Sequence, residues 1–93
     1  MTNKLFAGFI GSPSVLESSE NQELVQKGIV FHKFSFFNYT TCTVSINGSD
    51  PIYLAAEQGF NSDSSDAKIK SFIIINGGIN FNWVGSYRDA TIY

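Results

Sequence analysis

The sequence predicts an all-β fold: a small antiparallel β-sandwich of jelly-roll type, or a barrel, with about seven strands and little helix. Apolar and polar residues alternate with period two along several short segments, as in strands with one face in a core. Turn-forming pairs such as Asn47-Gly48 and Gly77-Gly78 separate these segments. The polar stretch 14–27 lacks this alternation, and its apolar residues do not form a helical stripe either.

The length of 93 residues fits a single β domain spanning residues 1–93. A chain of this size buries roughly two-thirds of its unfolded surface at most, so its own core is small. Yet 43% of the residues are hydrophobic and 15% are aromatic, while only 15% are charged, against about 25% in typical domains. The excess of apolar residues predicts that some of them face a partner.

The first strand is predicted from a short apolar run, which Pro13 ends because proline lacks the backbone donor that a strand ladder needs. The apolar residues of this run are Leu5, Phe6, Phe9 and Ile10. Residues 14–27 are expected to form a loop or a single helical turn, followed by a strand that enters near Glu23.

The segment "GIVFHKFSFFN" has the composition of a strong strand, rich in aromatic and branched residues. Strict alternation assigns Val30, His32, Phe34 and Phe36 to the core face, and Phe31, Lys33, Ser35 and Phe37 to the opposite face. The next segment, "TTCTVSING", alternates in the same way. It places Cys42, Val44 and Ile46 on one face and threonine and serine on the other.

The last third of the chain contains the most apolar run, "SFIIINGG". We expect residues 68–76 to form one long strand and Gly77-Gly78 to turn it into a hairpin. Ile79, Phe81 and Trp83 then alternate with polar residues on a strand that Gly85-Ser86 ends. A final short strand is expected at "ATIY".

Both faces of the predicted 68–76 strand are apolar, which raises the question of what covers the second face. One interpretation is a central strand covered by residues 14–27. The other is a subunit interface, since soluble monomers rarely expose large apolar patches. The candidate interface residues are Phe37, Phe72, Ile73 and Ile75.

Catalytic and metal-binding motifs are not evident in the sequence. His32 is the single histidine and Cys42 the single cysteine, so no internal disulfide and no multi-ligand cysteine or histidine cluster can form. A Cys42–His32 nucleophile pair is conceivable if their strands are neighbours, but no motif supports it. We therefore expect no enzyme activity, no catalytic residue and no cofactor. A calcium site in the loop 61–66 is disfavoured because the loop lacks the spacing of an EF-hand.

The formal charge of −2 argues against nucleic acid as a partner, because phosphate binding needs a basic face. Lys68 and Lys70 are the densest basic spot and are too few for that purpose. A membrane surface is excluded by the same reasoning. The alternative function is a carbohydrate-binding β-sandwich module that binds a receptor or the cell wall, because the aromatic residues Trp83 and Tyr87 would stack on a sugar if they were exposed. The competing interpretation places Trp83 in the core with Ile79 and Phe81.

Three segments together resemble small β-structured virion proteins of bacteriophages that infect low-GC Gram-positive bacteria. They are "FHKFSFFNYTTCTVSING", "DPIYLAAEQGF" and "IKSFIIINGGINFNWVGSY", and they span most of the chain from Phe31 to Tyr87. The resemblance implies a structural subunit of a tail, baseplate, fibre or capsid decoration, present in repeated copies. It implies no catalytic residues. The first thirty residues show no such likeness.

The expected function is therefore that of a non-enzymatic structural or assembly subunit, a phage virion component that oligomerises or docks through apolar strand faces. Its expected partners are copies of itself or other virion proteins. The start of the chain lacks the long apolar stretch and cleavage site of a signal peptide. The expected location is the virion, after synthesis in the host cytoplasm.

Overall fold

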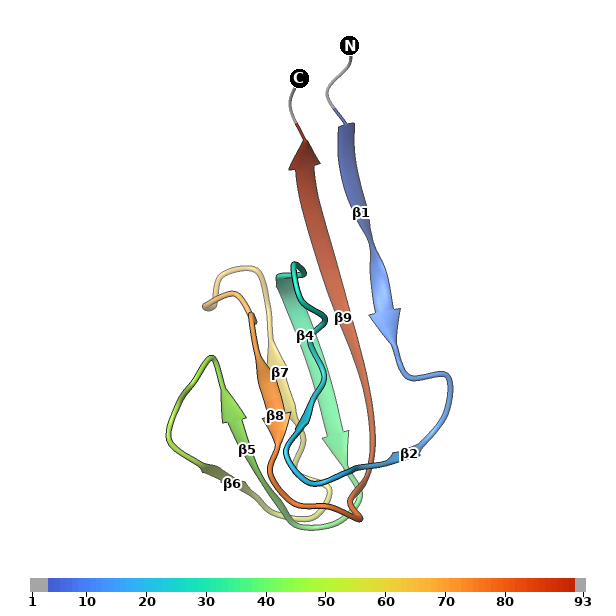
Figure 1. The fold of residues 1–93 in the computed structure, drawn as a ribbon, viewed down its shortest axis with the longest axis vertical. Coiled ribbons are helices and arrows are strands. Elements are labelled where there is room, and N and C mark those ends of the chain that lie inside the picture. The colour runs from blue at the N-terminus through green and yellow to red at the C-terminus, as the bar shows by residue number, and fades with distance from the viewer. Residues whose placement is uncertain (1–3, 92–93) are drawn as a thin grey trace.

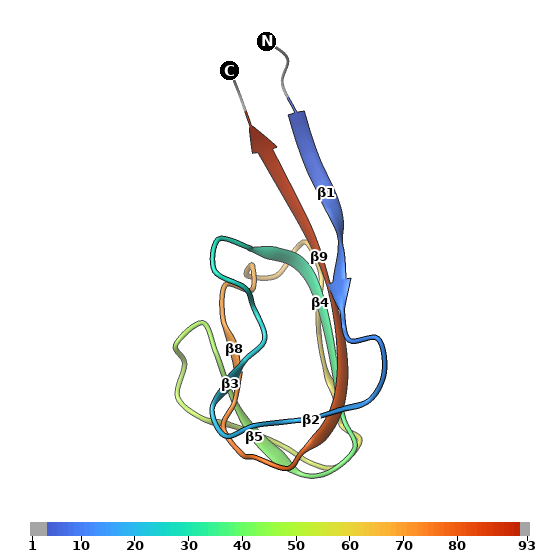
Figure 2. The same ribbon diagram turned by 45° about the vertical axis from the view of Figure 1, so that its right-hand side comes forward.

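The computed structural model describes residues 4–91, and the side chains of residues 8–88. Two antiparallel sheets pack face to face as an all-β sandwich, which confirms the predicted fold class (Figures 1 and 2). Sheet A contains, in spatial order, β1 (Lys4–Gly11), β9 (Asn80–Thr91), β4 (Phe31–Asn38) and β7 (Phe60–Ser62), with β2 (Leu16–Glu17) also paired to β9. Sheet B contains β3 (Gln22–Glu23), β8 (Phe72–Ile74), β5 (Cys42–Ile46) and β6 (Ile52–Leu54).

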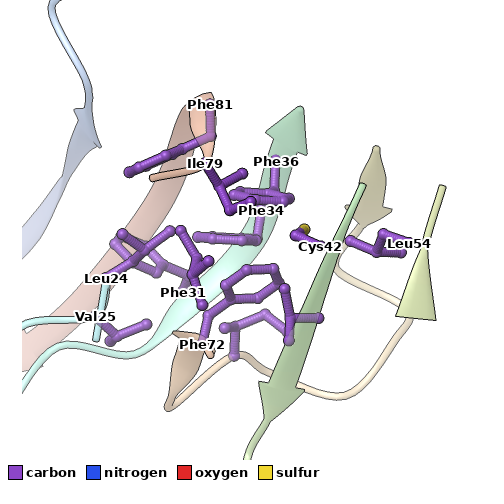
Figure 3. Close-up of a cluster of buried hydrophobic side chains, with 13 residues drawn as sticks. Leu24, Val25, Phe31, Phe34, Phe36, Cys42, Leu54, Phe72, Ile79 and Phe81 are labelled. Atoms are coloured by element: carbon purple, nitrogen blue, oxygen red, sulfur yellow. The ribbon is translucent and has the colours of Figure 1, made fainter. Parts of the chain in front are cut away.

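The core lies between the two sheets and is dominated by phenylalanine rings (Figure 3). Phe72 of sheet B packs between Phe34 and Phe36 of sheet A, with ring centroids 4.9 Å and 4.7 Å away. Such rings bury large apolar areas in a small domain and so hold the sheets together. The predicted inward faces of β5 and of the start of β9 are confirmed. The buried apolar side chains are Leu24, Val25, Phe31, Phe34, Phe36, Cys42, Val44, Leu54, Ile69, Phe72, Ile74, Ile79 and Phe81.

The ends of β1 and β9 extend beyond the sandwich. β4 pairs with β9 only as far as Tyr87, whereas β1 continues along β9 to the pair of Lys4 and Thr91. The far parts of the two strands therefore form a two-stranded ribbon that projects from one end of the molecule (Figures 1 and 2). The molecule measures 48 Å along this axis and 27 Å by 21 Å across it.

The strict alternation predicted for β4 is wrong at its start. A β-bulge between Phe31 and Lys33 adds one residue opposite β9, and such a bulge changes which face the preceding residues occupy. Phe31 therefore enters the core beside Phe34 and Phe36. His32, which the alternation assigned to the core face, is only half-buried.

The long strand predicted at residues 68–76 is also wrong, because β8 comprises only Phe72–Ile74. Ahead of β8, Ile69 and Phe31 each donate a backbone N–H to the carbonyl of the other at 2.9 Å, which forms an isolated bridge to the first residue of β4. The backbone N–H groups of Lys70 and Ser71 then donate to the Asn47 side chain in place of a neighbouring strand. The segment is therefore held by a bridge, a side chain and a short strand in turn. The predicted hairpin at Gly77-Gly78 is wrong as well, because β8 and β9 belong to different sheets and the turn connects the two sheets.

The predicted break at Gly85-Ser86 does not occur, since β9 runs without interruption from Asn80 to Thr91. Gly85 is buried against the ring of Phe31, and a side chain there would collide with it. The glycine accommodates a close contact within a continuous strand. Of the predicted final strand "ATIY", Ala90 and Thr91 belong to β9, and residues 92–93 lie outside the described part.

Residues 14–27 form no helix and instead contain β2 and β3, so the strand expected near Glu23 is present. This segment crosses from one sheet to the other. The Ser18 hydroxyl donates to the carbonyl of Asn76 at 2.7 Å and accepts from the N–H of Ile79 at 3.0 Å. β3 pairs with the edge of β8, so the segment extends sheet B and does not cover its outer face.

Candidate functional site

The outer face of sheet A carries the most exposed apolar side chains near the projecting ribbon. Phe9 is 78% exposed, Val15 is 50% exposed and Val84 is 45% exposed. Phe9 and Val84 line one shallow hollow on this face, and Val84 and Val15 line a second beside it. We call Phe9, Val15 and Val84 the outer patch of sheet A. A cluster of this kind, surrounded by polar residues, is typical of a contact surface.

β1 lies at the edge of sheet A and borders the outer patch. The N–H of Ser12 donates to the carbonyl of Trp83 at 3.0 Å, so it points toward β9. Donors alternate between the two sides of a strand, and the N–H groups of Phe9 and Gly11 therefore point to the open edge. An open edge of this length is a template for pairing with another strand.

The four predicted interface residues lie in different environments. Phe72 is 0% exposed and belongs to the core, so its assignment to an interface is corrected: the chain itself encloses its ring. Ile73 and Ile75 are half-buried on the outer face of sheet B. Phe37 is half-buried on sheet A and packs edge-on against Tyr39, with ring centroids 4.8 Å apart. For Ile73, Ile75 and Phe37 the interface role stays a prediction.

The two aromatic residues of the carbohydrate alternative do not form one surface. Trp83 is half-buried and packs against the core, with its ring 5.7 Å from the rings of both Phe31 and Phe34. Tyr87 is half-buried near the base of the ribbon and lines a cleft. Stacking of a sugar on an exposed pair is therefore not supported for Trp83, in line with the competing core interpretation.

The structure separates Cys42 from His32. β4 and β5 belong to different sheets, so the two strands are not neighbours and the condition for a Cys42–His32 pair is not met. Cys42 is buried in the core, and this burial raises the pKa of its thiol. A raised pKa leaves little thiolate at neutral pH, which is the opposite of an activated nucleophile.

We predict that Cys42 in the native protein reacts with iodoacetamide at pH 8 at least about tenfold more slowly than in urea, because both burial and the raised pKa suppress the thiolate. Mass spectrometry of timed samples measures both rates. The unfolded sample serves as the control for reagent activity. Equal rates in the two samples would contradict the packed position of Cys42.

The loop 61–66 uses its carboxylates for its own turn. Asp63 Oδ1 accepts from the N–H and the hydroxyl of Ser65, and Asp66 Oδ2 accepts from the N–H of Asp63 at 3.0 Å. The hydrogen bond from the Ser65 hydroxyl lowers the pKa of Asp63. Among the described side chains, no group of three or more histidine, cysteine or acidic residues is arranged to hold a metal ion.

No protein-family model matches this sequence, and no curated protein matches it either. No helix in residues 4–91 has the length and apolar character needed to cross a membrane.

The outer patch of sheet A was not predicted from the sequence, although signals for it exist. Val84 follows Asn80 and Asn82 at intervals of two residues, so it lies on the face opposite to Trp83. It is therefore an apolar residue on an otherwise polar face. Phe9 lies in a strand with apolar residues on both faces. What joins Phe9 to Val84 is the pairing of the first and last strands, which local periodicity does not reveal.

Proposed function

We propose that this chain is a non-enzymatic structural subunit that self-associates through the outer patch of sheet A and the open edge of β1. The proposal is carried by one combination of features: Phe9 and Val84 are exposed, and the edge strand β1 extends beyond the sandwich. Aromatic and aliphatic anchors at the centre of a contact supply most of the affinity in protein interfaces. Backbone pairing along β1 adds register.

The projecting ribbon supports this assignment. A two-stranded ribbon is marginally stable by itself in water, and three strands or a packed layer give independent stability. Beyond Tyr87, β9 has β1 as its partner and β4 no longer accompanies it. A second copy that pairs with β1 would supply the third strand and cover the outer patch in the same contact.

The assignment to a phage virion rests on the resemblance of residues 31–87 to small β-structured virion proteins. A subunit present in many identical copies fits a chain whose apolar content exceeds what its own core uses. The genes that flank the coding sequence test this part: we expect them to encode head or tail components. Flanking genes of ordinary cellular metabolism would contradict the virion assignment and leave the self-association proposal standing.

We predict that Phe9→Lys combined with Val84→Lys weakens self-association more than about tenfold, because loss of central anchors costs about 2 kcal/mol or more in an interface. Sedimentation velocity over a concentration series from about 1 µM to about 1 mM measures the association constant. Both positions face solvent in the single chain, so the variant should keep its fold.

The matched control is Tyr53→Lys, which places the same charge on a 65% exposed aromatic position in β6 of sheet B. We expect it to leave self-association unchanged. A native protein that stays monomeric over the whole series would overturn the proposal. Equal weakening by the control would move the contact away from sheet A.

A further inference from the structure

A second surface of the molecule collects positive charge at the end from which the ribbon projects. The segment before β4 and the segment between β7 and β8 meet at this end (Figures 1 and 2). Between them and β9 lies a cleft of about 360 Å³. Its charged and aromatic lining consists of His32, Lys68, Lys70, Tyr87 and Arg88. We call it the cationic cleft.

The β-bulge of β4 places His32 in the cationic cleft. Without the extra residue, His32 would alternate with Phe34 and face the core. With it, Phe31 takes the core position and His32 lines the cleft. Bulges are frequent beside binding sites because they redirect a side chain without ending the strand.

The bridge at Ile69 places the two lysines. Ile69 is buried, and its backbone N–H and carbonyl are both hydrogen-bonded to Phe31. Its neighbours Lys68 and Lys70 are exposed and both line the cleft. The Asn47 side chain donates to the carbonyl of Lys68 at 2.8 Å and accepts from the N–H of Lys70 at 2.7 Å, which fixes the backbone on either side of the bridge.

The charge of the cleft contrasts with that of the chain. The protein as a whole has a formal charge of −2, but the described lining of the cleft contains three permanent cations and no carboxylate. An adjoining hollow shares His32, Tyr87 and Arg88, adds Lys33 and extends to Phe9 of the outer patch. Cations gathered in a concave surface with low-dielectric walls raise the local concentration of anions.

The uncharged part of the lining indicates an organic ligand of small size. Tyr87 lies over the backbone of Gly8, its partner on β1. A Cβ atom added at position 8 would lie 3.0 Å from the Tyr87 hydroxyl oxygen. Ile29 and Val30 line the cleft as well. A cleft of this volume is at the lower end of the range for small-molecule sites, about 300–1,000 Å³.

We propose that the cationic cleft binds a small phosphorylated molecule, with its phosphate held by Lys68, Lys70 and Arg88 and its organic body placed against Tyr87. Three cations suit a dianionic phosphate better than a single carboxylate, and guanidinium and ammonium groups both bind phosphate oxygens. The cleft itself shares no lining residue with the outer patch of sheet A, and the proposal does not depend on self-association. It also differs from the neutral sugar site of the sequence analysis, since charge and not Trp83 defines it.

The test is an amide chemical-shift titration of the native protein with inorganic phosphate, glucose 6-phosphate, glucose and acetate, each in a separate series. We expect saturable shifts centred on Lys68, Lys70 and Arg88 with both phosphate compounds, and tighter binding of glucose 6-phosphate. Glucose and acetate should give no comparable shifts. Lys70→Gln combined with Arg88→Gln should raise the Kd at least about tenfold, because charge-assisted hydrogen bonds carry this much affinity.

Lys27→Gln is the matched control, because Lys27 is exposed and lines neither hollow. It should change the Kd by less than about twofold, since salt screens charges outside the site. The amide spectra of all variants report whether the fold is kept. Several results would overturn the proposal: no saturable shifts, shifts spread over every lysine, equal responses to acetate, or equal responses to glucose alone.

Discussion

Replacement of Asn38 by alanine is expected to lower the free energy of unfolding by about 3 kcal/mol, because it removes three hydrogen bonds to part-buried backbone groups. Asn38 ends β4, and its side chain is 0% exposed. Its Nδ2 donates to the carbonyls of Ala55 at 2.8 Å and Thr40 at 2.9 Å, and its Oδ1 accepts from the N–H of Gly59 at 2.9 Å. One amide therefore holds the β4–β5 connection and the β6–β7 connection together.

Urea unfolding followed by the fluorescence of Trp83 measures the effect. Asn80→Ala is the matched control, since Asn80 is an exposed asparagine of β9, and it should change the free energy of unfolding by less than about 0.5 kcal/mol. Asn38→Asp keeps the acceptor for Gly59 but turns both donors into acceptors that face carbonyls, so it should destabilise at least as much as alanine. An alanine variant as stable as the control would show that the Asn38 amide does not support the connections.

The parts of the fold that were predicted correctly are those in which the local sequence repeats with period two. Cys42, Val44, Phe81 and Ile79 all point into the core as the alternation requires. The buried face of a strand can be predicted from such a pattern without knowing the partner strand, because successive side chains of any strand point to opposite faces. The two-sheet sandwich then follows from several short strands that each have one apolar face.

The wrong predictions share a cause, since each concerns a residue whose position is decided by a distant part of the chain. The bulge at His32 is favoured because Phe31 fits over Gly85, which lies more than fifty residues later in the sequence. The 68–76 segment leaves the strand conformation because Asn47 binds its backbone. An apolar run such as "FIII" predicts burial correctly but does not reveal which backbone partners are present.

The candidate sites were less predictable than the fold for the same reason. Lys68 and Lys70 are visible as a basic pair in the sequence, but Arg88 and His32 join them only through the pairing of β4 with β9 and the bulge. The formal net charge of −2 does not reveal that three cationic side chains line one cleft. The sequence predicted more apolar side chains than the core can bury, but it did not identify the exposed ones. Phe72 is enclosed, whereas Phe9 and Val84 are exposed.

The contact between Gly85 and Phe31 makes Gly85→Ala the second substitution with a large expected effect. A Cβ atom at position 85 would lie 2.5 Å from Cδ1 and 2.7 Å from Cγ of Phe31. The ring cannot move away, because it is fully buried and packs against Phe34 and Trp83 at 5.6 Å and 5.7 Å. We expect a loss of about 3 kcal/mol from overpacking, which exceeds the gain of up to about 1 kcal/mol from replacing a strand glycine.

A double-mutant cycle with Phe31→Ala separates this collision from a general intolerance of β9. In the Phe31→Ala background the methyl group of Gly85→Ala enters space that the ring has left, so the substitution should be neutral or stabilising there. Melting temperatures of the four proteins, taken with an osmolyte that stabilises folded states, provide the comparison. Gly8→Ala is the control in the neighbouring strand: its Cβ would meet the hydroxyl end of half-buried Tyr87, which can shift, so the expected cost is about 1 kcal/mol or less. An equal penalty for Gly85→Ala with and without the Phe31 ring would place the cost in the backbone, and the ring would then not explain why β9 has a glycine at its centre.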